Sequence, residues 1–458
     1  EANAGELINT EITANADLTG NLDVLAGLDI GIGIELRQDN YTIERGDPVS
    51  YAYGRNNIVD PANPIRNTSS FPLVADAVGG IQGFPGFGPT AEVDDGRTAW
   101  DFYVDAGQHL TDWWLLGEGA RVQNTAFTGM AIVGKVSTRV QATDALSFRA
   151  SAGNGSRSPG VQQIYYSQRM TAILPAGLTE TVTVGDANPL RVAFGMGQLD
   201  PETSLSASAG ASFQTDDLGD TLRSLLLSAD VYQVLIDDRI VLSESVTGEI
   251  PAGEVDTPGR QAFRDLLVDN QLGAAQFFVN GIDTKTVGLD VGSGFGLGFG
   301  DVGLDLFGEV HYSETSIEAS DPQSDLVEGV DLFGPIQRNR VEKGQPRWTA
   351  TLGQTTHYDI LSFNLAFDYV GSVTGKYYMA LEDEKVWSGK WLTSASISIE
   401  PVEQLIVTVG GSNIFDVFPD EWGMVGREYP EIGYTYGLET LPFGVNGGFY
   451  YAALEYTL

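Results

Sequence analysis

The sequence predicts an all-β fold, a transmembrane antiparallel β-barrel, from two observations. The first is alternation: from Leu361 to Tyr369, large apolar residues take every second position, and the residues between them are Ser362, Asn364, Ala366 and Asp368. Successive side chains of a strand point to opposite faces, so one face is apolar and the other is mostly polar. The second is length, because such segments run for roughly ten residues, enough to cross a bilayer at a tilt. In a soluble sandwich the apolar face would cover a core, but the serine- and asparagine-rich face fits a hydrated barrel interior.

The same alternation recurs along the whole chain and gives about fifteen strands. It is clear again at 204–213 and at 391–400. The expected strands cover residues 7–19, 21–44, 98–111, 114–125, 127–143, 145–158, 202–215, 221–243, 284–297, 303–316, 347–359, 361–375, 390–401, 404–416 and 448–458.

The connections between these strands alternate between short and long. Long connections are expected at 45–97, 159–201, 244–283, 317–346, 376–389 and 417–447. The connection at 123–126 belongs to the same series but is brief. Short ones are expected near Thr19-Gly20, Thr111-Asp112, Thr143-Asp144, Asp216 to Asp220, Gly298 to Asp301, Tyr358-Asp359 and Pro401 to Glu403. Outer-membrane barrels have short periplasmic turns and long surface loops, so the long connections are expected outside the cell. Their length and aromatic content indicate functional loops.

The strand count also predicts an incomplete barrel. If the last strand ends in the periplasm, counting back about fifteen strands places Glu1 outside the cell. An odd strand set leaves an edge whose backbone groups lipid cannot satisfy. We therefore expect a processed or truncated chain that does not close by itself.

Composition excludes several classes of function. The 458 residues include no Cys and 3 His, which removes disulfide frameworks, Cys-based zinc sites and thiol catalysis. Lys and Arg number 25 against 62 Asp and Glu, a formal charge of −37, which excludes a nucleic-acid partner. Two accounts of the acidity stay open: solvated acidic loops, or attraction of cations or of divalent-bridged lipopolysaccharide. Clusters at 92–95 and 318–325 are the candidates for the second account.

Five short motifs occur in order along the chain. They are Glu35-Leu36-Arg37 with Tyr41 and Gly46-Asp47-Pro48; Arg149-Ala150-Ser151 through Asn154 to Pro159; Leu199-Asp200-Pro201-Glu202-Thr203; Ala229-Asp230-Val231-Tyr232 to Ile236 through Ile240; and Asn413-Ile414-Phe415-Asp416 with Pro419. Together they resemble the C-terminal barrel half of TonB-dependent outer-membrane receptors. Ser156 and Asp200 depart from the residues usual in that family.

The resemblance implies a plugged barrel of about 22 strands in the outer membrane of a Gram-negative bacterium. Surface loops and plug would capture a scarce nutrient, and the TonB-ExbB-ExbD system would supply the energy for its import into the periplasm. The plug, the TonB-contacting segment and about seven strands would precede Glu1, in an N-terminal chain or segment that pairs with this one. Outer-membrane lipid and lipopolysaccharide would surround it. The resemblance implies no enzyme activity and no cofactor.

The sequence offers few candidate site residues. Tyr377, Tyr378 and Trp387 lie in an expected surface loop, where they are candidates to stack on a substrate or to pack within the loop. Glu309 and His311 share the lumen face of a strand, as candidate substrate contacts rather than metal ligands.

At the C-terminus, Tyr456 and Leu458 match the place of the family's assembly signal, with Leu where Phe is usual; the alternative role of Tyr456 is an interfacial belt. No catalytic constellation and no metal site is predicted.

Three rival functions stay open beside active transport. A passive porin shares the alternating strands, an adhesive or structural surface barrel would use the long loops, and a surface enzyme would need the catalytic set that is missing. The cargo is expected to be a small molecule, oligosaccharide or peptide. The scarcity of Arg and Lys favours a neutral or cationic one.

Overall fold

A single antiparallel sheet dominates the protein, as a computed structural model shows for residues 3–24, 26–51, 85–174, 177–216, 218–248, 255–320, 332–377, 380–421 and 435–457. The sheet contains seventeen strands, and a separate sheet contains two. The all-β antiparallel fold predicted from the sequence is confirmed.

Fifteen of the strands follow one another around the sheet, each antiparallel to the next. They are β1 (Gly5–Leu22), β2 (Leu28–Arg45), β3 (Val93–Thr111), β4 (Trp114–Thr125), β5 (Gly129–Gln141), β6 (Leu146–Arg157), β9 (Glu202–Asp216), β10 (Leu222–Leu242), β11 (Ala274–Phe299), β12 (Val302–Ser320), β13 (Trp348–Tyr358), β14 (Leu361–Val370), β17 (Lys390–Val402), β18 (Leu405–Ser412) and β19 (Phe449–Tyr456).

The remaining strands are excursions from this meander. β7 (Gln168–Leu174) and β8 (Gly177–Val184) form a hairpin between β6 and β9, and β15 (Val373–Tyr377) and β16 (Ala380–Trp387) form one between β14 and β17. The helical segments are α1 (Pro48–Tyr51), η2 (Pro89–Ala91), α3 (Val161–Tyr165), α4 (Pro189–Ala193), α5 (Pro258–Asp269), α6 (Pro335–Glu342) and η4 (Leu438–Phe443). No helix in the described ranges has the length and hydropathy needed to cross a membrane.

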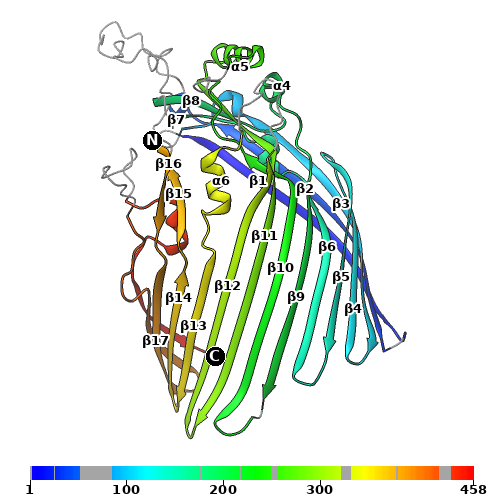
Figure 1. Cartoon of the computed structure of the whole chain (residues 1–458), viewed down its shortest axis with the longest axis vertical. Coiled ribbons are helices and arrows are strands. Elements are labelled where there is room, and N and C mark those ends of the chain that lie inside the picture. The colour runs from blue at the N-terminus through cyan, green and yellow to red at the C-terminus, as the bar shows by residue number, and fades with distance from the viewer. Residues whose placement is uncertain are drawn as a thin grey trace.

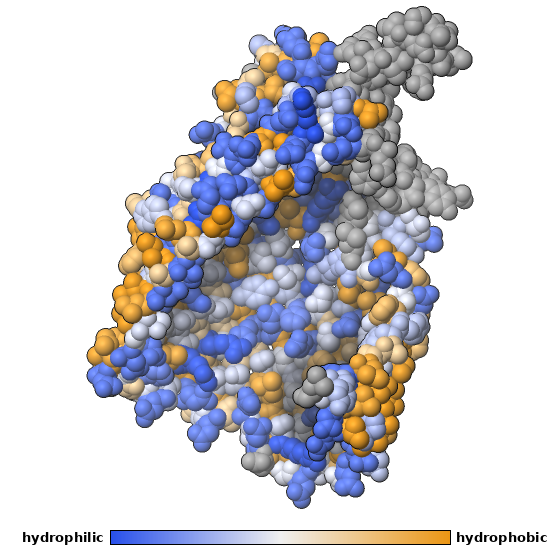
Figure 2. Space-filling model, turned by 180° about the vertical axis from the view of Figure 1, so that it is seen from behind, coloured by the Kyte–Doolittle hydropathy of each residue, from blue (hydrophilic) through white to orange (hydrophobic). Residues whose placement is uncertain are grey.

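The two ends of the sheet differ. Hairpins β7–β8 and β15–β16 and helices α4, α5 and α6 gather at one end, the loop end, while short turns close the other, the turn end (Figure 1). Figure 2 shows a hollow face of pale and hydrophilic residues, with hydrophobic residues along the outside of the wall. The sheet is therefore a curved wall around a hydrated lumen.

Several expected boundaries were wrong; β3, for example, begins at Val93, inside the expected connection 45–97. The first turn is not at Thr19-Gly20, because β1 continues to Leu22 and β2 begins at Leu28, directly after Gly27, which has a φ of 124°. Only glycine adopts such a φ without strain. Likewise, residues 274–283 belong to β11 rather than to a loop, since hydrogen bonding to β10 and β8 extends that strand beyond the membrane.

Aromatic side chains mark both rims of the apolar band. Tyr312 packs on Trp348 with ring centroids 4.6 Å apart at the loop side. At the turn end, Trp113 and Trp114 stack 6.0 Å apart and are exposed. Interfacial tyrosine and tryptophan rings of this kind fit the headgroup level of a membrane.

Glycines opposite aromatic residues let the rings lie flat on the lumen wall. A Cβ at Gly33 would lie 2.2 Å from the ring of Tyr103, its cross-strand partner, and one at Gly288 would lie 2.1 Å from Tyr232. These two positions therefore require glycine, because a side chain there would displace the ring.

An apolar core lies at the loop end, outside the wall itself. It is formed by β8, α4, α5 and the start of β11, and we call this unit the cap. Phe194 packs against Phe263 and Phe277 at centroid distances of 4.9 and 5.5 Å. α5 begins at a Thr257 N-cap followed by Pro258, and α4 at an Asn188 N-cap followed by Pro189, which explains both helix starts from sequence.

A buried ion pair fixes the cap. Arg191 and Asp186 approach to 2.9 Å with both side chains almost completely buried. Burial raises the pKa of Asp186 and lowers that of Arg191, while the attraction between the two opposes both shifts. The guanidinium also donates to the carbonyls of Gly197 and Phe278, each at 2.6 Å, so the pair ties α4 to β11.

Candidate functional site

The lumen face of β1 to β6 carries an unusual density of charge, and we call it the charged wall. Cross-strand register places Glu11 beside Asp39 and Asp39 beside Arg97, and the alternation repeats this toward the turn end. The carboxylates on this face are Glu11, Asp17, Asp29, Glu35, Asp39, Asp101 and Asp105.

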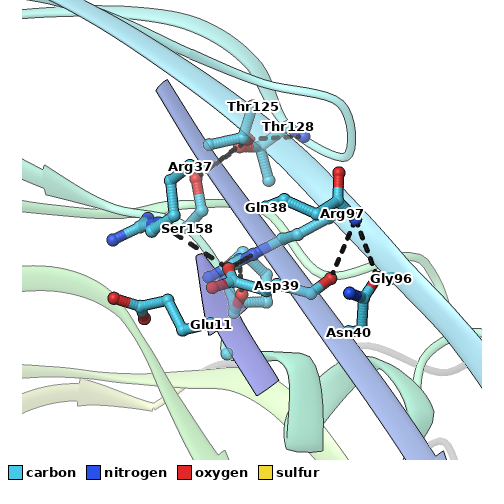
Figure 3. A network of polar contacts seen from close by, with 12 residues as sticks. Glu11, Arg37, Gln38, Asp39, Asn40, Gly96, Arg97, Thr125, Thr128 and Ser158 are labelled. Carbon is cyan, nitrogen blue, oxygen red and sulfur yellow. Dashed lines mark hydrogen bonds and ion pairs between the residues drawn. The ribbon is translucent and has the colours of Figure 1, made fainter. Parts of the chain in front are cut away.

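Asp39 is the centre of the tier nearest the loop end (Figure 3). It is 5% exposed, accepts a hydrogen bond from Arg97 Nε at 2.8 Å, and lies 3.7 Å from Arg37 Nε. Arg97 also donates to the carbonyl of Pro159. A Cβ at Gly96 would lie 2.2 Å from the carbonyl oxygen of Asp39, so glycine allows this close approach.

Three hydroxyl groups close the same tier. Thr125, Thr128 and Ser158 hydrogen-bond to one another at 2.6 to 3.2 Å, joining the β4–β5 turn to the end of β6 (Figure 3). Next to β6, Arg157 grips Glu202 with two hydrogen bonds of 2.6 and 2.7 Å, and Glu202 accepts a third from the backbone of Ile240. Charge-assisted bonds of this geometry hold β6, β9 and β10 in a fixed arrangement.

A second tier lies one step toward the turn end. Arg121 contacts Asp101 at 2.8 Å and Glu35 at 3.5 Å, and its guanidinium lies 5.9 Å from the ring centroid of Tyr103. Tyr103 in turn donates to Asp17. The tier is thus a continuous polar chain from β1 to β4.

Below this tier the charged wall is hollowed. A cavity of about 630 Å³ is lined by Gly31, Gly107, Gly117 and Gly119, with Asp29, Asp105, Lys135 and Ser137 around it. A second cavity of about 380 Å³ adjoins it beside Glu35, Tyr103, Arg121 and Lys135. We call the first cavity the glycine recess. The recess exists because its glycines have no side chains to fill it, and the mixed charges around it suit a hydrated polar solute.

The lumen residues predicted from sequence lie on a different part of the wall. His311 Nδ1 is 3.0 Å from Asp290 and its Nε2 is 3.7 Å from Glu309, with all three side chains about half exposed. Among the described residues, no group of three or more His, Asp and Glu is arranged to hold a metal. Substrate contact by Glu309 and His311 stays a prediction.

Of the three predicted loop aromatics, only Trp387 has a described side chain, so a role for this group in substrate contact stays a prediction. Trp387 is fully buried against Val373 and Phe443. Tyr377 ends β15, its side chain lying outside the described part of the structure, and Tyr378 lies outside it altogether. Of the C-terminal pair, Tyr456 is 60% exposed on β19, and Leu458 lies outside the described residues.

The charged wall was missed as a site, although its signal is present in the sequence. Glu35, Arg37 and Asp39 occupy every second position, so all three fall on one face of a strand. Partners such as Arg97 and Arg121 come from β3 and β4, and only strand register reveals them.

Comparisons with known proteins agree with this architecture. The family model described as TonB dependent receptor-like, beta-barrel, matches residues 4–414. No curated protein matches the chain in sequence.

Several solved receptors share the fold. A mutant of the ferric enterobactin receptor PfeA from Pseudomonas aeruginosa, in complex with enterobactin, superposes with a TM-score of 0.61 at 15% identity, over 98% of this chain and 54% of that one. The siderophore receptor PirA from Acinetobacter baumannii superposes with a TM-score of 0.56 at 15% identity, over 99% of this chain and 55% of that one. PirA from Pseudomonas aeruginosa superposes with a TM-score of 0.57 at 13% identity, over 99% of this chain and 58% of that one. The chain thus spans little more than half the length of these receptors.

Proposed function

Because the chain belongs to the TonB-dependent receptor-like β-barrel family and lies in the outer membrane of a Gram-negative bacterium, we propose that it imports a scarce nutrient into the periplasm. The import uses energy that the TonB-ExbB-ExbD system transmits from the inner membrane. The match over residues 4–414 is the observation that carries this proposal. A wall of fixed charges around a hydrated lumen supports it, since such a wall can bind and pass a solute without covalent chemistry.

The proposed cargo is a polar small molecule that is neutral or cationic. On β1 to β4 the charged wall presents these seven carboxylates against three arginines, Arg37, Arg97 and Arg121, each of them held in an ion pair. β5 adds Lys135 and Arg139 to the lumen face, and β6 adds Arg149 and Arg157, which are paired with Asp230 and Glu202. An anionic solute would meet net repulsion along this path. The solved receptors of the same fold are described as siderophore receptors, so a ferric siderophore is the competing cargo.

Uptake by cells that carry the complete receptor tests both the dependence of import on TonB and the class of cargo. The probes are a labelled ferric siderophore, a labelled neutral oligosaccharide and a labelled cationic peptide, each followed with and without a functional TonB. Uptake of the oligosaccharide or the peptide that stops without TonB supports the proposal. Uptake that persists without TonB would make the protein a passive porin, and uptake of the siderophore alone would contradict the proposed cargo.

We also propose that β1 and β19 pair with further strands of a larger barrel. In the described ranges, β1 pairs with β2 and β19 with β18, and neither pairs with another strand. Both strands are exposed over nearly their whole length, and unpaired backbone groups in hydrocarbon cost several kcal/mol each. A partner with a plug and about seven strands fits these edges.

Disulfide cross-linking from cysteines placed at Ile8 or Tyr450 tests this pairing. Cross-links from both positions to a separate set of strands are expected. A direct cross-link between Ile8 and Tyr450 positions would show that the sheet closes on itself.

A further inference from the structure

The ladder of backbone hydrogen bonds between β5 and β6 is interrupted, and we call this interruption the seam. Residues 135–141 of β5 pair with residues 147–153 of β6, and the ladder ends at the Lys135–Gly153 pair. Beyond this point residues 129–134 pair with β4, residues 154–157 pair with β9, and no pairing joins the two segments, all of which lie in described parts of the chain. The neighbouring ladders β4–β5 and β6–β9 are continuous through the same level.

Side chains span the seam in place of the ladder. Asn154 accepts a hydrogen bond from the amide of Gly134 at 2.8 Å and donates to the carbonyl of Ile132 at 3.2 Å, so its carboxamide substitutes for a peptide group. Gln123 reaches the carbonyl of Ser156 at 3.1 Å. At the loop end the three hydroxyls of Thr125, Thr128 and Ser158 close the gap.

Cavities lie against the seam on both faces of the wall. The lumen cavity of about 380 Å³ lies on one side, and a cavity of about 600 Å³ lies on the outer side. Asn154, Gly134 and Ala120 line both. Small residues, Gly134 and Ala120, therefore form the wall where the two cavities lie back to back.

The outer cavity belongs to the lipid-facing surface. Its outward side chains are mostly small or aliphatic, including Val104, Ala106, Val136, Ala152 and Leu205. The aromatic residues Trp100 and Trp114 lie on the same outer face toward the two ends of β3 and β4. A groove between two aromatic rims is covered by hydrocarbon. Glu118 is the one carboxylate among the residues that line this cavity.

We propose that the outer cavity binds one acyl chain of a membrane lipid, and that Asn154 is the latch that keeps this chain out of the lumen. The occupant is identified by chemistry: a flexible hydrocarbon chain fits an apolar groove that faces the bilayer. This inference goes beyond nutrient import and does not depend on it. It assigns a lipid site and a side opening to a specific place in the wall.

Photolabelling of the purified protein tests the lipid site. The protein is placed in vesicles of phosphatidylethanolamine whose acyl chain carries a diazirine, and labelled peptides are identified by mass spectrometry. A several-fold excess of label in residues 116–154 over residues 348–370 of the equivalent outer surface is expected. Ala120→Trp fills the groove and should abolish the excess. Ala350→Trp, which adds the same bulk to an outer alanine of β13, should leave it unchanged. Equal labelling of the two surfaces, or equal loss in both variants, would overturn the site.

The latch has a separate readout in the same experiment. Asn154→Ala removes both bridging hydrogen bonds and should bring label onto the lumen-facing side chains of Val133 and Lys135. Asn364→Ala is the matched control, because Asn364 also bridges two strands through its carboxamide but lies where the ladders β13–β14 and β14–β17 are continuous. Lumen labelling that stays at the wild-type level in Asn154→Ala, or that rises equally in both variants, would overturn the latch.

Discussion

The lumen face of the sheet is polar, but two parts of it are built from different kinds of side chain. On the charged wall, buried Asp39 and partly buried Arg97 form ion pairs over glycine-thinned backbone, and the β5–β6 ladder is interrupted. On β13, β14 and β17, the lumen face is instead a set of short hydroxyl and carboxamide bonds, which we call the hydroxyl wall. Thr351 bonds to Asp368 and Thr355 to Asn364, each at 2.8 Å, on continuous ladders.

The difference shows what the alternation of polar and apolar residues does and does not specify. Both walls cross the membrane with the same period of two. The charged wall leaves space in the lumen because glycine removes side-chain volume, and its long charged side chains reach across several strands. On the hydroxyl wall the Asp368 carboxylate is held by the short side chain of Thr351 instead. Under the proposed function, we therefore expect the solute to pass along the charged wall rather than along the hydroxyl wall.

The largest expected difference concerns loss of a carboxylate from each wall. Asp39→Ala should lower the free energy of unfolding by about 3–5 kcal/mol, because it leaves Arg97 buried without its partner. Asp368→Ala on the hydroxyl wall should cost about 0.5–1.5 kcal/mol, since only a hydrogen bond from Thr351 is lost. Reversible unfolding in lipid vesicles measures both. Similar costs in the two variants would remove the distinction between the walls.

Next in size is the cost of charge on the outer face of the hydroxyl wall. Leu365→Arg should cost about 2–4 kcal/mol near the membrane midplane, whereas Asn364→Arg points into the lumen and should cost much less. The same unfolding measurement tests the pair. A larger cost for Asn364→Arg would mean that the two faces are inverted.

Filling the glycine recess should impair transport without unfolding the protein. Gly117 on β4 and Gly292 on β11 both face the lumen, but they lie in different parts of the sheet. A Cβ at Gly117 would lie 2.6 Å from a serine hydroxyl, and one at Gly292 would lie 2.8 Å from another. Gly117→Leu should reduce nutrient uptake several-fold while surface binding persists, and Gly292→Leu should reduce it less. Equal uptake in the two variants would show that the recess is not on the path.

The smallest effect is expected at the rim beside β17. Burial raises the pKa of Asp420, but hydrogen bonds from Lys390 and Ser388 outweigh this and lower it to about 2. A carboxyl whose pKa falls on folding stabilises the folded state above its usual value of 3.8, and this contribution is lost as the pH falls toward 2. The stability difference between the wild type and Asp420→Asn should therefore shrink over that interval. A difference independent of pH would contradict the ion pair.

Much of this architecture could be predicted from the sequence because strand periodicity is local information. The alternation around Phe363 and Phe367 assigned inner and outer faces, and the spacing of turn residues placed most of the short turns. The family resemblance rested on short ordered motifs such as Asn413 to Asp416, and the match over residues 4–414 confirms it. The first turn was misplaced because Gly20 and Gly27 are both acceptable turn residues, and only the register with β2 decides between them.

The tertiary structure alone decided which charges meet. Asp39, Arg97 and Pro159 are far apart in sequence, and only the order and register of the strands bring them together. The cap likewise depends on the parallel pairing of β8 with β11, which no local pattern signals. The sequence by itself determined that strands cross a membrane, because alternation is set by neighbouring residues. Space, ion pairs and the seam arise between strands, so they depend on a pairing register that the chain acquires only by folding.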